Sequence, residues 1–153
     1  SHKMRLEYAL LLSVLLDMAK CAIDFTDCGT ILEVTDVKFG NCIQTPCTVE
    51  RYSEVSVEIE LSRKTHVPPL DSVSAVAEYV HRGISWELGI SPSDTCTTWT
   101  CPLQDVNTYS YQAKISFEPI SYLRPGEVLI KTFNTLQPDG DPIFCASWDI
   151  NFV

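Results

Sequence analysis

The sequence predicts an all-β protein in which two antiparallel sheets pack against each other as a sandwich. Several short segments alternate apolar and polar side chains, clusters of turn-forming residues separate these segments, and no long segment has the 3.6-residue period of an amphipathic helix. Strands that each have one apolar face bury it by packing sheet on sheet. The 153 residues provide one ordinary domain.

Five segments are predicted to be strands. Residues 54–61 alternate strictly, because Val, Ile or Leu occupies every second position and Glu or Ser stands between them. This pattern indicates a strand with one buried and one exposed face. Residues 73–82 alternate less strictly, and residues 109–117 have an aromatic-rich inner face. Residues 127–136 and 144–152 complete the set. Turn clusters separate the segments, at Pro68-Pro69, 91–94, 124–126 and 138–142.

The first 21 residues are expected to be an expression scar and a secretory signal peptide. Three residues precede Met4, a charged start then leads into an apolar run over residues 8–16, and Ala19 and Cys21 form a small-x-small exit. The apolar run is about half of the ~20 residues that a membrane span requires, so no stable membrane insertion is expected. The alternative is an amphipathic N-terminal helix. With the signal peptide removed, residues 22–153 form a single domain.

Six cysteines lie beyond residue 21, and an even number in a short secreted chain indicates three disulfides. Many pairings are possible from sequence alone. Two pairs are close enough to close local loops, which would leave the first of the six to bond with the last. The residues concerned are Cys28, Cys42, Cys47, Cys96, Cys101 and Cys145. No Cys-x-x-Cys pair and no matching histidine spacing occur, so no metal site is expected.

Charge and nucleophile content exclude two classes of function. Eleven Lys and Arg oppose 20 Asp and Glu, for a net charge of −9, which is the wrong sign for binding nucleic acid. His66 falls in a loop and His81 near a strand end, and no Gly-x-Ser-x-Gly motif occurs. Asp139 and Asp141 lie in a proline-flanked turn that lacks the ligand series of a calcium loop. We therefore predict neither an enzyme nor a bound cofactor.

The cysteine pattern occurs together with several short motifs: Asp27-Cys28-Gly29, Pro46-Cys47, Cys101-Pro102-Leu103, Tyr109-Ser110-Tyr111 and Phe144-Cys145. In this combination, residues 25–152 resemble the ML (MD-2-related lipid-recognition) family, and the chain is most similar to its Niemann-Pick type C2 branch. The resemblance implies an immunoglobulin-like sandwich with an apolar cavity between its sheets, which admits a sterol or an acyl chain. It also implies the disulfides Cys28–Cys145, Cys42–Cys47 and Cys96–Cys101.

The resemblance further implies which residues line the cavity. Carried over position by position, the family's pocket sites fall on Phe39, Val49, Val55, Val57, Ile59, Leu88, Ile115, Phe117 and Tyr122. Further ligand-lining residues are expected on the aromatic inner faces and on the C-terminal strands, where the chain is longer than the family pattern. They are Tyr79, Trp86, Tyr109, Tyr111, Val128, Ile130, Phe133 and Trp148. Sterol-carrying members have a proline-rich apolar stretch where this chain has Glu87. A ligand with a polar head, held by Glu87, Tyr79 or Tyr122, is therefore also expected.

These observations predict a secreted, monomeric carrier that binds one sterol, fatty acid or semiochemical-like lipid and moves it through aqueous fluid. The four asparagines lie outside any Asn-x-Ser/Thr sequon, which favours extracellular fluid over the lysosome. One alternative is an accessory that presents a lipid to a protein receptor, as in innate-immune recognition. Another is a structural sandwich with a closed core, because alternation alone does not distinguish a core from a cavity lining.

Overall fold

The structure, a computed structural model, describes residues 23–121 and 124–153. Within these residues the chain forms nine strands and a short 3-10 helix, which confirms the predicted all-β class. The expected signal peptide and Tyr122 lie outside the described residues. The elements are β1 (Thr26–Asp27), β2 (Leu32–Phe39), β3 (Cys47–Val49), β4 (Glu54–Arg63), β5 (Val73–His81), β6 (Ile84–Ser91), η2 (Thr95–Thr97), β7 (Thr108–Ser116), β8 (Gly126–Asn134) and β9 (Cys145–Phe152).

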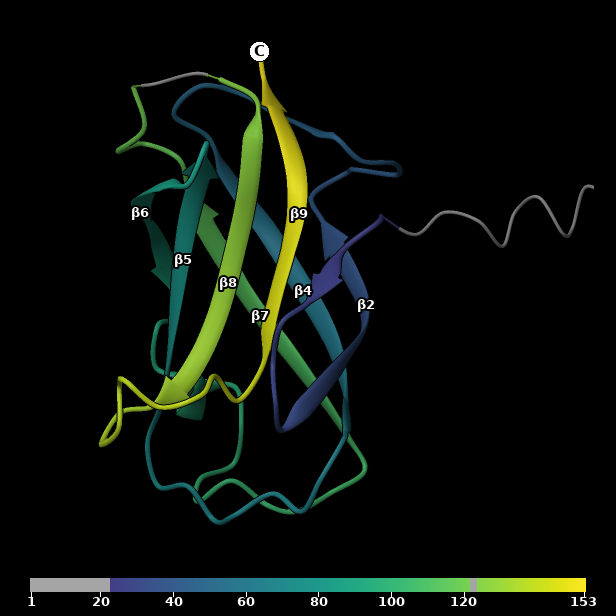
Figure 1. Cartoon of the computed structure of the whole chain (residues 1–153), viewed down its shortest axis with the longest axis vertical. Coiled ribbons are helices and arrows are strands. Elements are labelled where there is room, and N and C mark those ends of the chain that lie inside the picture. Colours follow the sequence, from purple (N-terminus) through teal and green to yellow (C-terminus); the bar gives the residue numbers. More distant parts are fainter. Residues whose placement is uncertain (1–22, 122–123) are drawn as a thin grey trace, which may run out of the picture.

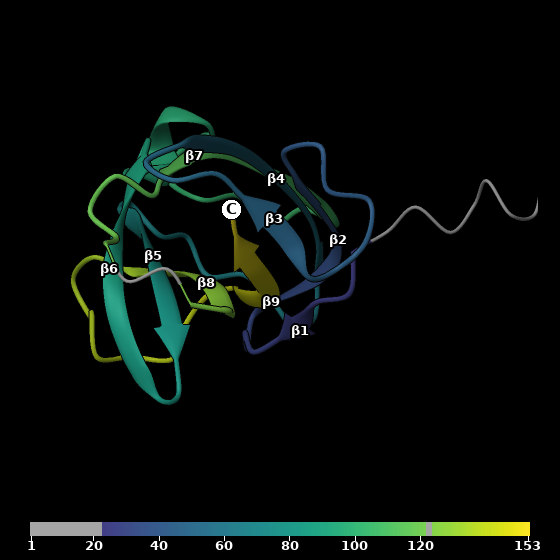
Figure 2. The same ribbon diagram turned by 90° about the horizontal axis from the view of Figure 1, so that it is seen from above.

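Two sheets face each other across the interior, as in an immunoglobulin-like sandwich (Figures 1 and 2). The first sheet has the order β1-β9-β8-β5, and the second has the order β7-β4-β2. Neighbouring strands in both orders are antiparallel, whereas β3 pairs with β9 in parallel. Alternate side chains of each strand point inward, so apolar residues of both sheets meet in one core.

Strand β6 joins the two sheets along one side. Its first part pairs with β5, from His81↔Ile84 to Ala77↔Leu88, and its last residues pair with β7, from Gly89↔Ser116 to Ser91↔Lys114. Viewed from above, β6 closes the side of the sandwich between β5 and β7 (Figure 2). Strand β6 nevertheless keeps one inner face, because Trp86, Leu88 and Ile90 are half-buried or buried whereas the residues between them are exposed.

All five predicted strands are present, with ends that move by one or two residues. Four further strands, β1, β2, β3 and β6, were not predicted from the sequence. In β2 a register shift between Val34 and Asp36 interrupts the alternation, so Leu32 and Val34 are buried in one phase and Val37 and Phe39 in the other. Strand β6 does alternate, with Ile84, Trp86, Leu88 and Ile90 separated by Ser, Glu and Gly, so it was missed although its pattern is present in the sequence.

The three disulfides pair as predicted, with Cα–Cα distances of 4.7 Å for Cys28–Cys145, 5.4 Å for Cys42–Cys47 and 5.5 Å for Cys96–Cys101. The first bond links the end of β1 to the start of β9. Gly29 is required at this crossing, because a Cβ there would lie 2.7 Å from the Cα of Phe144. The Asp27-Cys28-Gly29 motif therefore fixes the close approach of the chain after β1 to the start of β9.

Candidate functional site

Six aromatic rings form an unbroken series through the interior at the upper end of the molecule, where β9 ends in Figure 1. We call this series the upper cluster. Neighbouring rings have centroid distances of 5.2 to 6.2 Å, mostly in edge-to-face contact. The rings follow the order Trp148, Phe39, Phe117, Phe152, Tyr79 and Trp86. They come from β9, β2, the residue after β7, β5 and β6, so both sheets and the joining strand contribute.

A second aromatic group, the lower cluster, occupies the opposite end of the interior and consists of Trp99, Tyr109, Tyr111 and Phe144. Its polar atoms are bonded to backbone carbonyls. Trp99 Nε1 donates to Ser110 O at 2.8 Å, Tyr109 Oη to Gln104 O, and Tyr111 Oη to Pro92 O at 3.4 Å. Burial raises the pKa of Tyr111, so its hydroxyl stays neutral. The sequence grouped Tyr109 and Tyr111 with the ligand-lining residues, but the structure places them in this separate group.

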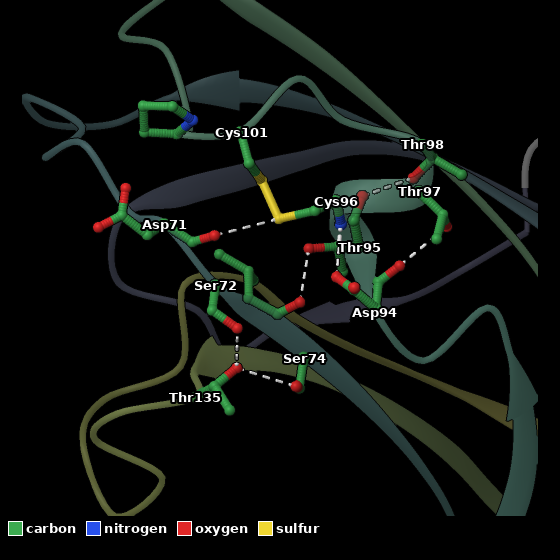
Figure 3. Close-up of a disulfide and its surroundings, with 12 residues drawn as sticks. Asp71, Ser72, Ser74, Asp94, Thr95, Cys96, Thr97, Thr98, Cys101 and Thr135 are labelled. Atoms are coloured by element: carbon green, nitrogen blue, oxygen red, sulfur yellow. Dashed lines mark hydrogen bonds between the residues drawn. A yellow bond between two sulfur atoms is a disulfide. The ribbon is translucent and has the colours of Figure 1, made fainter.

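Covalent and hydrogen bonds hold the lower end closed (Figure 3). The Cys96–Cys101 disulfide anchors η2, and Asp94 Oδ1 accepts from Cys96 N at 2.9 Å. Buried Thr95 donates to Val73 O at 2.9 Å, at the start of β5. Thr135, just beyond β8, bonds through its hydroxyl to Ser72 at 2.9 Å and Ser74 at 3.0 Å. Backbone bonds from Leu32 N and Ile31 N to Ile143 O join the two sheets there.

The upper end has hydrogen bonds of its own, such as Phe117 N to Ser53 O at 2.9 Å and Val153 N to Val49 O at 3.0 Å, and a surface hollow of about 700 Å³ lies there. Three predicted site residues line this hollow, Phe39, Val49 and Val55, together with residues of the loops on either side of β3. Phe39 and Val49 are buried, whereas Val55 and Trp86 are half-buried. The predicted lining therefore approaches the surface at this end.

Most of the predicted site residues point inward. The fully buried ones are Phe39, Val49, Val57, Ile59, Tyr79, Leu88, Tyr109, Tyr111, Ile115, Phe117, Val128, Ile130 and Trp148. Phe133 was expected to line the site, but Val128, Ile130 and Thr132 occupy the inner face of β8. Phe133 therefore falls on the outer face, where it pairs with Ser74.

Glu87 also departs from expectation. Glu87 is exposed on β6 and lies opposite Glu78 on β5. The residues on either side of Glu78, Ala77 and Tyr79, point inward, so the carboxylate of Glu87 faces away from the interior. Tyr79, by contrast, reaches the upper rim, where its hydroxyl donates to Arg124 O at 2.6 Å. Phe152 was missed as a site residue, although the alternation of residues 144–152 places it on the same face as Trp148.

The upper cluster is apolar and electrically neutral. Among the described residues, the buried polar or charged side chains are Thr95, Thr132 and Ser147, none of which carries a charge. In residues 23–121 and 124–153, His, Cys, Asp and Glu form no group of three that could hold a metal ion. No helix of the described chain is both long and apolar enough to cross a membrane. The buried interior of the described residues is therefore uncharged and mostly apolar.

Comparison with known proteins agrees with this geometry. The model of the ML domain family matches residues 22–152. A solved Niemann-Pick type C2 protein from the Japanese carpenter ant is similar, with a TM-score of 0.68 and 18% identity over 85% of this chain and 99% of that chain. The C-terminal domain of wzt has a TM-score of 0.50 and 9% identity over 85% of this chain and 78% of that chain. At such identities the structural matches show the fold alone. A search of the curated proteins found no match.

Proposed function

The chain belongs to the ML domain family, and we propose that it is a non-enzymatic carrier that binds one hydrophobic small molecule between its sheets and moves it through aqueous fluid. Family membership supports lipid binding, and ML proteins are generally not enzymes. The carried molecule is a sterol, a fatty acid or a semiochemical-like lipid. The observation that carries the proposal is the neutral upper cluster, which spans both sheets and includes Phe39 at the surface hollow.

The proposed binding mode places the ligand among the rings of the upper cluster. Its rings contact one another at the edges, so a chain or a fused ring system enters by replacing ring-to-ring contacts with ring-to-ligand contacts. Each buried methylene contributes about 0.8 kcal/mol. About ten methylenes thus contribute on the order of 8 kcal/mol before the entropy of association is subtracted, and micromolar binding corresponds to about 8 kcal/mol. A somewhat longer lipid therefore needs no strong polar contact to bind.

The first test is the lipid content of protein secreted by eukaryotic cells, measured by organic extraction and mass spectrometry. Competition between cholesterol and oleic acid then assigns the ligand class. A stoichiometric lipid that one class displaces supports the carrier. If no lipid is found and neither compound binds, the proposal is wrong and the interior is a closed core.

Blocking the upper end should prevent binding. Val55 lies at the start of β4 opposite Ile115 and borders the hollow. We expect Val55→Trp to lower the affinity for radiolabelled oleic acid or cholesterol about tenfold or more, because a bulky ring overfills the entrance. The matched control is Gln112→Trp, an exposed position on the outer face of β7, which should bind as the unchanged protein does. Equal affinities for both variants would place the entrance elsewhere.

A lipid-presenting accessory to a protein receptor is the second candidate. Ile43 and Tyr52 favour it, because they are 69% and 61% exposed in the loops beside the same hollow. A carrier exchanges its lipid with vesicles unaided, whereas an accessory retains the lipid until its receptor is present. Stopped-flow transfer of a fluorescent lipid to phosphatidylcholine vesicles separates these two functions.

We further propose secretion into extracellular fluid as a monomer. The disulfide-rich ML fold is typical of extracellular or lysosomal-lumen proteins, and the absence of a glycosylation sequon from the sequence favours the former. Expression in eukaryotic cells, with the protein quantified in medium and lysosomes, tests the destination. Sedimentation of the secreted protein tests the oligomeric state.

A further inference from the structure

The indole N–H of Trp148 is buried without a hydrogen-bond partner. Trp148 is 2% exposed, and among the described residues its Nε1 is the buried side-chain nitrogen or oxygen atom that has no partner. An indole N–H is a donor only, so it requires an acceptor atom. Buried donors without an acceptor are rare in native proteins because their hydration is lost without compensation.

Other polar atoms of the aromatic interior show that the fold normally supplies such acceptors. Trp99 Nε1 donates to Ser110 O at 2.8 Å, and Tyr79 Oη donates to Arg124 O at 2.6 Å. Trp148 differs because it faces apolar surroundings. Its ring lies 5.2 Å from that of Phe39, and its strand neighbour is Val128. The missing acceptor is therefore specific to the inner end of the upper cluster, where the ring series begins.

The position of Trp148 sets where that acceptor has to be. Trp148 is four residues before Phe152, the last residue of β9 at the upper end. At about 3.3 Å per residue, Trp148 lies roughly 13 Å along the strand from that end. An acceptor for the N–H of Trp148 must therefore belong to the part of a ligand that is buried, and not to a group that remains at the rim.

We propose that Trp148 Nε1 donates a hydrogen bond to an oxygen atom of the bound ligand, and that the carried molecule is a neutral oxygenated lipid such as an ester, ketone or alcohol. This inference rests on the carrier function proposed above. A neutral oxygen is required because no Lys, Arg or His occurs among the buried residues of the described chain. A carboxylate at this depth would lose its hydration without a counter-charge. Trp148 is thus a specificity-determining residue that selects an oxygenated lipid over a hydrocarbon.

Matched ligands test the selection. Methyl laurate and tetradecane have chains of equal length, and only the ester offers an acceptor. In competition with a fluorescent naphthylamine, the protein should show a preference for the ester over the alkane about tenfold greater than the partition of the two compounds between water and hydrocarbon, as expected for one buried hydrogen bond. Laurate, which carries a charge, should bind more weakly than its methyl ester. The excess preference for the ester should disappear in Trp148→Phe.

A second substitution keeps the test independent of folding. Replacement of Trp148 by benzothienylalanine removes the N–H and keeps the fused-ring shape, so this variant should bind the two ligands in the ratio that their partition between water and hydrocarbon predicts. The control is Trp99→Phe in the lower cluster, because Trp99 already donates to a backbone carbonyl. This control should retain the excess preference for the ester. If the excess preference persists without the N–H of residue 148, the assignment of Trp148 is wrong.

Nuclear magnetic resonance reports directly on the donor. The chain has three tryptophans, so three indole N–H signals can be assigned by substitution. Methyl laurate should move the Trp148 signal downfield and slow its exchange, whereas tetradecane should not. Binding of both ligands in the ratio that their partition predicts, with the same Trp148 signal, would overturn this inference and leave the carrier function intact. If neither ligand nor any sterol or fatty acid binds, the carrier function itself is wrong.

Discussion

Asp27 shows how one side chain positions the first strands. Its Oδ1 accepts from Gly29 N and its Oδ2 accepts from Val34 N, each at 3.0 Å, and Lys64 Nζ lies 3.2 Å from Oδ2. One carboxylate therefore fixes the tight turn after β1 and the bulged strand β2. The aspartate of the Asp27-Cys28-Gly29 motif holds Cys28 where it can bond with Cys145.

Removal of this carboxylate should destabilise the domain. We expect Asp27→Ala to lower the free energy of unfolding by about 2 kcal/mol, because two backbone N–H groups lose a charged acceptor. Urea unfolding followed by fluorescence measures the change. Asp24→Ala, at an exposed position three residues earlier, serves as the control and should unfold as the unchanged protein does. A change of less than about 0.5 kcal/mol for Asp27→Ala would mean that water replaces the carboxylate.

At the scale of elements, Asp105 joins the end of β4 to the segment that precedes β7. Its carboxylate accepts from Arg63 Nη1 at 3.0 Å and from Val67 N at 3.3 Å, and it lies 2.8 Å from His66 Nδ1. The hydrogen bond from Arg63 is the largest cause that lowers the pKa of Asp105 below its ordinary value of 3.8, and the bonds from Val67 and His66 act in the same direction.

This arrangement predicts a pH-dependent contribution to stability. A carboxyl group with a lowered pKa in the folded state stabilises the fold above its ordinary pKa and loses that contribution as the pH falls through the lowered value. We expect Asp105→Asn to be less stable than the unchanged protein near neutral pH and the difference to shrink well below pH 3.8. Urea midpoints over this range test the sign, with Asp139→Asn as the exposed control. A difference that is constant with pH would exclude the charge of Asp105 as its cause.

The elements also show what could be read from the sequence. Strands β4, β5, β7, β8 and β9 keep one inner face throughout, so alternation alone predicts them. The bulge in β2 depends on contacts with distant strands, which a local pattern does not contain. The alternation of β6 could have predicted a strand, but its change of sheets depends on its pairing with β5 and β7. Phe133 was misassigned because the register of β8 was carried over from a family pattern rather than from its own alternation.

At the scale of the whole molecule, the sequence predicted which residues face inward but not which of them belong to the upper cluster and which to the lower cluster. Tyr111 and Tyr79 both occupy inner faces, yet the first belongs to the lower cluster and the second to the upper cluster. The division depends on where each strand crosses the interior and therefore on the complete topology. The unpaired N–H of Trp148 is likewise visible only once the surroundings of the side chain are known.

Disulfides in the lower part and at the upper end of the molecule close loops of very different length. In the chain-entropy model a disulfide stabilises the fold according to the length of chain that it closes. Cys28–Cys145 spans a separation of 117 residues and ties strands at the lower part of the sandwich, whereas Cys42–Cys47 spans 5 residues in a loop at the upper end. The long closure should contribute about 5 kcal/mol and the short one about 2 kcal/mol.

We therefore expect the double variant Cys28→Ala/Cys145→Ala to lose about 5 kcal/mol, a third or more of a total stability of about 5–15 kcal/mol, and Cys42→Ala/Cys47→Ala to lose about 2 kcal/mol. Urea unfolding under oxidising conditions measures both losses. A bound lipid should raise the stability of the second variant as it does that of the unchanged protein, because its sheets remain joined at the lower end. Equal losses for the two variants would show that the loop at the upper end stabilises the fold by contacts rather than by chain closure. The upper end would then not be the end at which the sheets open for a ligand.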